Sequence, residues 1–168
     1  DALLRDGGFI VTGRAGMDLY PVPVGTKIRQ ATSFQSDVGG SAGNIAVALA
    51  RAGQNVSLLT SLSNDAVGDF VADRLAEYGV GTELISRTTG LERTSLALAE
   101  TISQGTEVVI YRNNAADLVL DDSLISAISF TNIKAFVVTG TGLSCAESAS
   151  QLKECARAAR AAGCPVVL

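Results

Sequence analysis

The sequence predicts an α/β protein with a mostly parallel central sheet, helices on both of its faces and a small antiparallel lid. Three observations lead to this fold class. Short apolar strands alternate with helical segments over residues 9–79. The strands are apolar at nearly every position, which is typical of parallel strands buried on both faces. Two strands at 94–100 and 106–112 then break the alternation and form a hairpin.

The first strand is expected at residues 9–12 (FIVT), which end at Gly13. Residues 17–25 follow with prolines at positions 21 and 23. Because proline cannot donate to a strand ladder, this segment is not expected to be a central strand. We predict an extended edge segment that leaves the core.

A glycine-rich turn then introduces the first helix, in the stretch VGGSAGNIAVALARAG. The helix is expected from Ser41 to Ala52, and Gly53 is suited to end it at the C′ position. Residues 55–60 (NVSLLT) form the next predicted strand.

The second helix is expected to end at Gly79 and to take Ser63 or Asn64 as its cap, with Asp65 in its first turn. Its apolar residues recur at helical spacing and so predict one buried face. They are Val67, Phe70, Val71, Leu75 and Tyr78.

The hairpin at 94–112 lies outside the main sheet in this interpretation and forms a small second sheet with residues 19–35. The central pattern returns at 134–139 (KAFVVT). Ser144 and Glu147 have the spacing of a capping box for a helix that runs to about Ala162 and ends at Gly163.

A last strand begins at residues 165–168. Because a parallel sheet that ends on an uncovered apolar strand invites aggregation, we expect the chain to be the N-terminal part of a longer protein.

Composition excludes several classes of function. The chain has 168 residues, a net charge of −4 without runs of like charge, and no histidine. These features argue against nucleic acid or a membrane as the main partner and against a zinc site. No signal peptide or membrane span is apparent, and three cysteines without C-x-x-C spacing predict reduced, buried thiols of a cytoplasmic protein.

The candidate site residues are Asp18, Gly39, Gly40, Asn44 and Arg112. Asp18 follows the first strand and can accept hydrogen bonds from hydroxyl groups, or it is an ordinary turn carboxylate. The two glycines at a helix start let a polar ligand approach the backbone, with Asn44 as a further ligand, or they form a tight turn with Asn44 as local cap. Arg112 is suited to a carboxylate or phosphate, or is a solvated arginine at a strand end.

Two nucleotide-binding motifs are excluded by spacing. GRAG at 13–16 does not open a helix and lacks the G-x-G-x-x-G pattern, and no G-x-x-x-x-G-K-[ST] occurs.

Taken together, the motifs resemble the ribokinase-like (PfkB) carbohydrate kinases. The resemblance rests on GRAGMD at 13–18, GGSAGN at 39–44, the helix end at Gly53, N-D-x-x-G at 64–68 and the hairpin at 94–112. It implies that the chain is the substrate side of one ribokinase-like domain, with lid segments at about 17–35 and 94–112. It also implies ATP and Mg²⁺ as cofactors, and it allows a homodimer through the lid.

The stretches GRAGMDLYPV, VGGSAGNIAVAL, SLALAE, IYRNNAAD and VTGTGLS resemble family members that phosphorylate keto sugar acids. The implied substrate is 5-dehydro-2-deoxy-D-gluconate of myo-inositol catabolism, with 2-keto-3-deoxygluconate or another sugar as the alternative. The resemblance implies that Asp18, Gly39, Gly40 and Asn44 bind the sugar and that Arg112 meets its carboxylate.

One departure limits the expected activity. The family's catalytic G-A-G-D type of stretch is absent from the sequence. We therefore expect no catalytic residue in this chain and an adenine site elsewhere, and a non-catalytic sugar-binding fragment stays open as the second hypothesis.

Overall fold

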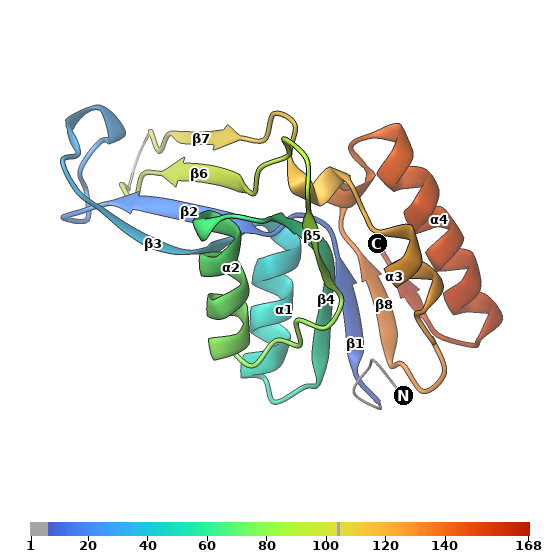
Figure 1. Cartoon of the computed structure of the whole chain (residues 1–168). Coiled ribbons are helices and arrows are strands. Elements are labelled where there is room, and N and C mark those ends of the chain that lie inside the picture. Colours follow the sequence, from blue (N-terminus) through green and yellow to red (C-terminus); the bar gives the residue numbers. More distant parts are fainter. Residues whose placement is uncertain (1–6, 104) are drawn as a thin grey trace.

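The computed structural model describes residues 7–103 and 105–168 and contains two sheets (Figure 1). The central sheet has the strand order β5-β4-β1-β8-β9, and each neighbouring pair is parallel. The predicted parallel sheet is therefore confirmed. Its strands are β1 (Phe9–Thr12), β4 (Val56–Ser63), β5 (Ile85–Thr88), β8 (Ala135–Val138) and β9 (Val166–Val167).

Helices cover both faces of this sheet (Figure 1). Neighbouring residues of β1 point into different cores, because successive side chains of a strand alternate between its faces. Ile10 packs in the cluster that includes α4, and Val11 packs in the cluster that includes α1 and α2. The helices are α1 (Ser41–Arg51), α2 (Ala66–Glu77), α3 (Asp122–Ser126) and α4 (Ala146–Ala161), with 3₁₀ turns at Ile28–Gln30, Ala116–Leu118 and Gly140–Leu143.

The second sheet projects from one end of the central sheet and has the order β3-β2-β6-β7 (Figure 1). The predicted hairpin of β6 and β7 is confirmed as antiparallel. The pair β2 and β6, however, is parallel, so the sheet is mixed rather than antiparallel. The reason is that β2 follows β1 and β6 follows β5, so both leave the same edge of a parallel sheet. The strands are β2 (Gly16–Pro21), β3 (Phe34–Gly39), β6 (Ser95–Ala99) and β7 (Val108–Tyr111).

The prediction of an edge segment at 17–25 is wrong, because β2 lies between β3 and β6. Its pairing with β6 ends at Leu19, whereas its pairing with β3 continues to Pro21. Pro21 is thus the last residue of the strand and lies beyond its β6 neighbour, where its missing N–H costs no ladder hydrogen bond.

Two predicted helix starts are also corrected. Asp65, not Ser63 or Asn64, caps α2, and its carboxylate accepts hydrogen bonds from the backbone N–H groups of Val67 and Gly68, both at 3.1 Å. The capping box of Ser144 and Glu147 does not form.

The residue at the N-cap of α4 is instead Cys145, without a side-chain cap. The Ser144 hydroxyl donates to the Thr141 carbonyl oxygen at 2.9 Å. The helix ends at Gly53, Gly79 and Gly163 are confirmed by their positive φ angles.

Strand β5 was not predicted from the sequence. The cysteines are free thiols, and Cys155 and Cys164 are buried as expected, whereas Cys145 is only half-buried. Burial raises the pKa of the Cys155 thiol to about 11. Among the described residues, no helix is both long and apolar enough to cross a membrane.

Candidate functional site

The candidate site lies where the second sheet joins the carboxyl end of the central sheet. Asp18 lies in the middle of β2, directly opposite Asp37 of β3. Its carboxylate lies over Gly39, where an added Cβ would be 1.9 Å from the carboxylate carbon. Gly39 is therefore glycine because the Asp18 side chain occupies the space that a Cβ would need.

The surroundings of Asp18 are polar but largely closed to solvent. Arg14 Nη2 lies 3.5 Å from Asp18 Oδ1, and the Tyr20 hydroxyl donates to Oδ2 at 3.4 Å. Burial raises the pKa of Asp18, and the Arg14 cation opposes that rise. Oδ1 is buried and has no hydrogen-bond partner within the described part of the chain. The carboxylate thus keeps unused acceptor capacity.

Gly40 is a glycine for a different structural reason. It is the N-cap of α1 with a φ of 91°, and an added Cβ would lie 2.4 Å from the Arg14 carbonyl oxygen. That oxygen accepts hydrogen bonds from the N–H groups of Ala42 and Gly43 at 3.1 and 3.3 Å. The first turn of α1 is therefore capped by the backbone of the β1–β2 turn. The N–H groups of Ala42 and Gly43 are therefore occupied by Arg14, and the part of Gly39 and Gly40 in ligand binding stays a prediction.

Asn44 lies in the first turn of α1 with its residue exposed. It is not the cap of this helix, because that position belongs to Gly40. It borders a hollow of about 210 Å³, whose other lining residues are Tyr20, Asp37, Val38, Val47, Arg51 and Tyr78.

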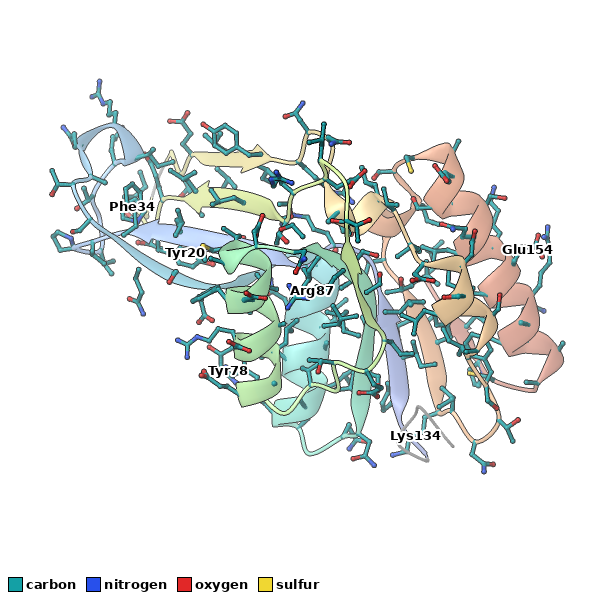
Figure 2. The ribbon with its side chains drawn as sticks, viewed as in Figure 1. Tyr20, Phe34, Tyr78, Arg87, Lys134 and Glu154 are labelled. Carbon is teal, nitrogen blue, oxygen red and sulfur yellow. The ribbon has the colours of Figure 1, made fainter. Side chains whose placement is uncertain are left out.

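Figure 2 shows Tyr20 on the second sheet and Tyr78 near the end of α2. Tyr20 borders this hollow together with Asn44, and its hydroxyl also donates to Asp18 Oδ2.

Arg112 follows β7 and already has partners in the chain. Its Nε donates to Asp117 Oδ2 at 3.1 Å, and its Nη2 contacts the same oxygen. Nη2 also donates to the Thr141 carbonyl oxygen at 2.7 Å, and Nη1 donates to the Ser144 hydroxyl at 2.8 Å. The solvated-arginine alternative is therefore wrong, and most of the guanidinium fork is engaged inside the protein.

Thr141 connects the parts of this region and was not predicted as a site residue. Its hydroxyl accepts the Arg14 backbone N–H at 3.1 Å and lies 2.8 Å from the Ser41 hydroxyl. Together with the Arg112 contact, it joins the β1–β2 turn, the start of α1 and the lid hairpin. Its only signal in the sequence is its place in GTG after an apolar strand, because its partners Arg14, Ser41 and Arg112 lie 127, 100 and 29 positions away.

The cofactors expected from the sequence are ATP and Mg²⁺. In residues 7–103 and 105–168, no group of three or more His, Cys, Asp or Glu side chains is placed to hold a metal ion. The first turn of α1 is not open to a phosphate, since Arg14 caps it. The described residues therefore provide no all-protein cage for Mg²⁺, and the start of α1 provides no cradle for the phosphates of ATP.

Comparisons with known proteins find relatives that are named as sugar kinases. A protein from Photobacterium profundum named 5-dehydro-2-deoxygluconokinase is 38% identical over 80% of this chain and 41% of its own length. One of that name from Clostridium perfringens is 31% identical over 97% of this chain and 48% of its own.

Two solved structures have the same fold. A fructokinase from Xylella fastidiosa has a TM-score of 0.79 at 31% identity. The match covers 96% of this chain and 50% of the fructokinase chain. A 2-dehydro-3-deoxygluconokinase from Thermotoga maritima has a TM-score of 0.82 at 25% identity. That match covers 95% of this chain and 49% of the Thermotoga chain. This chain thus spans half or less of the length of these relatives. The model of the pfkB family carbohydrate kinases matches residues 9–168, and the chain belongs to that family of sugar kinases.

Proposed function

We propose that this chain is the substrate-binding part of an ATP-dependent kinase that phosphorylates a keto sugar acid, 5-dehydro-2-deoxy-D-gluconate. The observation that carries the proposal is the Asp18 carboxylate, which is seated over Gly39 and has an unpartnered oxygen. A buried carboxylate with free acceptor capacity is suited to bind hydroxyl groups of a sugar. The relatives named for this keto sugar acid support the choice of substrate. With that substrate, the enzyme would act in myo-inositol catabolism.

The proposed roles follow the positions of the residues. Asp18 accepts hydrogen bonds from substrate hydroxyls, and Asn44 accepts and donates them. The backbone at Gly39 and Gly40 forms the floor. Arg112 meets the substrate carboxylate through Nη1, because its contact with the Ser144 hydroxyl is exposed and can be exchanged. Closure of the lid over the sugar would exclude water and so protect the γ-phosphoryl group from hydrolysis.

The chemical step is assigned to a segment outside this chain. Phosphoryl transfer needs a phosphate cradle, usually a metal ion, and a group that activates the acceptor hydroxyl. We propose that ATP, Mg²⁺ and the catalytic base belong to that segment, and that the domain is completed by it. A structure of the Xylella fastidiosa fructokinase contains ATP, which supports the nucleotide.

We also propose an oligomeric state and a cellular compartment for the enzyme. Exposed apolar residues on the edge strand β7, namely Val108, Ile110 and Tyr111, support a homodimer through the lid. The free thiols support a reducing compartment such as the cytoplasm.

A coupled assay of ADP release tests the proposal on the intact protein, meaning the polypeptide that carries this sequence at its natural length. The substrates are 5-dehydro-2-deoxy-D-gluconate, 2-dehydro-3-deoxy-D-gluconate, fructose and ribose. We expect the highest kcat/KM with the first and a large loss in the Asp18→Asn variant. Highest efficiency with a neutral sugar would overturn the choice of substrate. Sugar binding without turnover of any substrate would favour a non-catalytic sugar-binding protein.

A further inference from the structure

Arg14 is a buried cation that the sequence did not suggest as part of the site. It lies in the turn between β1 and β2 and is 6% exposed. Its backbone is held on two sides, since its N–H donates to Thr141 Oγ1 and its carbonyl oxygen caps α1. Its Nε donates to the Ser95 hydroxyl on β6 at 2.8 Å. The guanidinium thus lies against the second sheet, and the Arg14 backbone is held by Thr141 and the start of α1.

The partner of this cation is Asp18. Nη2 lies 3.5 Å from Asp18 Oδ1, and both atoms are buried without a hydrogen-bond partner in the residues that the structure describes. A buried ion pair with incomplete hydrogen bonds is a poor source of stability, because desolvation of both charges is only partly offset. The arrangement therefore points to a role in the site rather than in folding.

We propose that Arg14 is the positioning residue of Asp18: it keeps the Asp18 carboxylate ionised, fixes its orientation toward the sugar and ties it to lid strand β6 through Ser95. This inference rests on the proposed role of Asp18 in sugar binding. Arg14 acts through Asp18, since its unpartnered nitrogen faces the carboxylate.

The charges around Asp18 explain why it needs a cation. The titratable groups that face it are Arg14, Tyr20 on its own strand and Asp37 on β3. Burial and the Asp37 charge favour the protonated form of Asp18, whereas Arg14 and the Tyr20 hydroxyl favour the carboxylate. A protonated Asp18 would lose acceptor capacity for a sugar hydroxyl. Removal of Arg14 should therefore weaken binding most at low pH.

The test uses the intact protein with Arg14→Met, Arg14→Lys and Asp18→Asn. The matched control is Arg157→Met, because Arg157 pairs with Glu154 on the surface of α4, where Glu154 is labelled in Figure 2. Calorimetry measures the affinity for 5-dehydro-2-deoxy-D-gluconate from pH 5 to pH 8. Carbon-13 NMR of labelled aspartate follows the titration of Asp18 without sugar, and the Asp18→Asn spectrum assigns the signal.

We expect Arg14→Met to move the titration of Asp18 to higher pH and to weaken sugar binding about tenfold more at pH 5 than at pH 8. Arg14→Lys should restore part of both effects because it keeps the charge. Arg157→Met should change neither. A uniform loss of affinity at all pH values, with the Asp18 titration unmoved, would overturn the inference and leave Arg14 as a structural residue.

Two controls separate this inference from the proposed function and from misfolding. If Asp18→Asn leaves sugar affinity unchanged, the proposed role of Asp18 in sugar binding is wrong. The affinity measurements then no longer test Arg14, whereas the NMR titration of Asp18 still tests its coupling to Arg14. If Arg14→Met does not fold, Ser95→Ala takes its place. That variant frees Nε of Arg14 and should cause the same shift in a weaker form, and an unchanged pH profile in Ser95→Ala would then overturn the inference.

Discussion

The Arg112 guanidinium is bound to the Asp117 carboxylate, whose side chain is 1% exposed. The pair joins the end of the lid hairpin to the 3₁₀ turn that follows it, and Thr141 and Ser144 extend the contact to the turn after β8. The arginine expected to meet a substrate carboxylate therefore already has a carboxylate partner inside the chain. Its structural role and its proposed role in binding make different predictions.

The structural role predicts a loss of stability. Arg112→Ala would leave Asp117 buried without its cation, and we expect the free energy of unfolding to fall by about 3 kcal/mol, as for other broken buried pairs. Urea unfolding of the intact protein measures the change. In the double variant Arg112→Ala/Asp117→Asn most of the loss should be recovered, because no buried charge is left unpaired. A double variant no more stable than the single one would contradict this account.

The binding role predicts a difference between substrates. Arg112→Ala should reduce kcat/KM for the keto sugar acid by about 1.5–3 kcal/mol, the range of a charged hydrogen bond, and should affect a neutral analogue much less. Arg112→Lys should lose less kcat/KM than Arg112→Ala, because lysine keeps the positive charge although it lacks the paired N–H donors of the guanidinium. Equal losses for acid and neutral substrates would leave Arg112 with its structural role alone.

Gly39 offers a way to displace Asp18 without changing its charge. The backbone of Gly39 is not left-handed, so alanine fits the chain, but its Cβ would overlap the Asp18 carboxylate. We expect Gly39→Ala to weaken sugar binding at least tenfold and to add little to Asp18→Asn in the double variant. Gly140→Ala is the matched control, because a Cβ there meets no atom within 4 Å. Additive losses would show that the two positions act separately.

Asn44 separates binding from helix capping. Because the N-cap of α1 is Gly40, Asn44→Ala should leave the unfolding free energy unchanged or slightly higher, since alanine favours helices. Sugar binding should weaken by about 1–3 kcal/mol, as when a polar partner is removed. ATP affinity serves as the control and should hardly change. Unchanged sugar affinity would remove Asn44 from the site.

The central fold was predictable because its signals are local. The apolar strands at 9–12 and 134–139 and the glycines that end the helices depend on residues a few positions apart. The order of the second sheet depends on the direction in which β2 and β6 leave the central sheet, and a strand pattern does not carry that information. Strand β5 (ISRT) is short and half polar, so its pairing with β4 left no apolar signal.

The site was predictable only in its residue types. The sequence indicated Asp18 and Gly39 separately, but their overlap in space comes from the register of β2 and β3. Arg14 and Thr141 are separated by 127 positions, and their hydrogen bond exists only because β1 and β8 are neighbours. Asp117 was not singled out from the sequence, because its burial and its pairing with Arg112 appear only in the folded chain.

The last prediction concerns the effect of Asp18 on stability. Burial raises its pKa above the ordinary value of 3.8 despite the Arg14 cation, so the folded protein binds this proton more tightly than the unfolded chain does. The resulting stability is fully present below pH 3.8 and is lost as pH rises through the folded pKa. At pH 7 the ionised carboxylate therefore costs stability, and Asp18→Asn should be at least as stable as the wild type while it loses sugar affinity. Urea unfolding between pH 4 and pH 8 should show this advantage shrinking as pH falls, because the wild-type carboxylate then becomes neutral as well. An Asp18→Asn variant clearly less stable than the wild type at pH 7 would mean that Asp18 is held for folding through its pairing with Arg14, and not for binding.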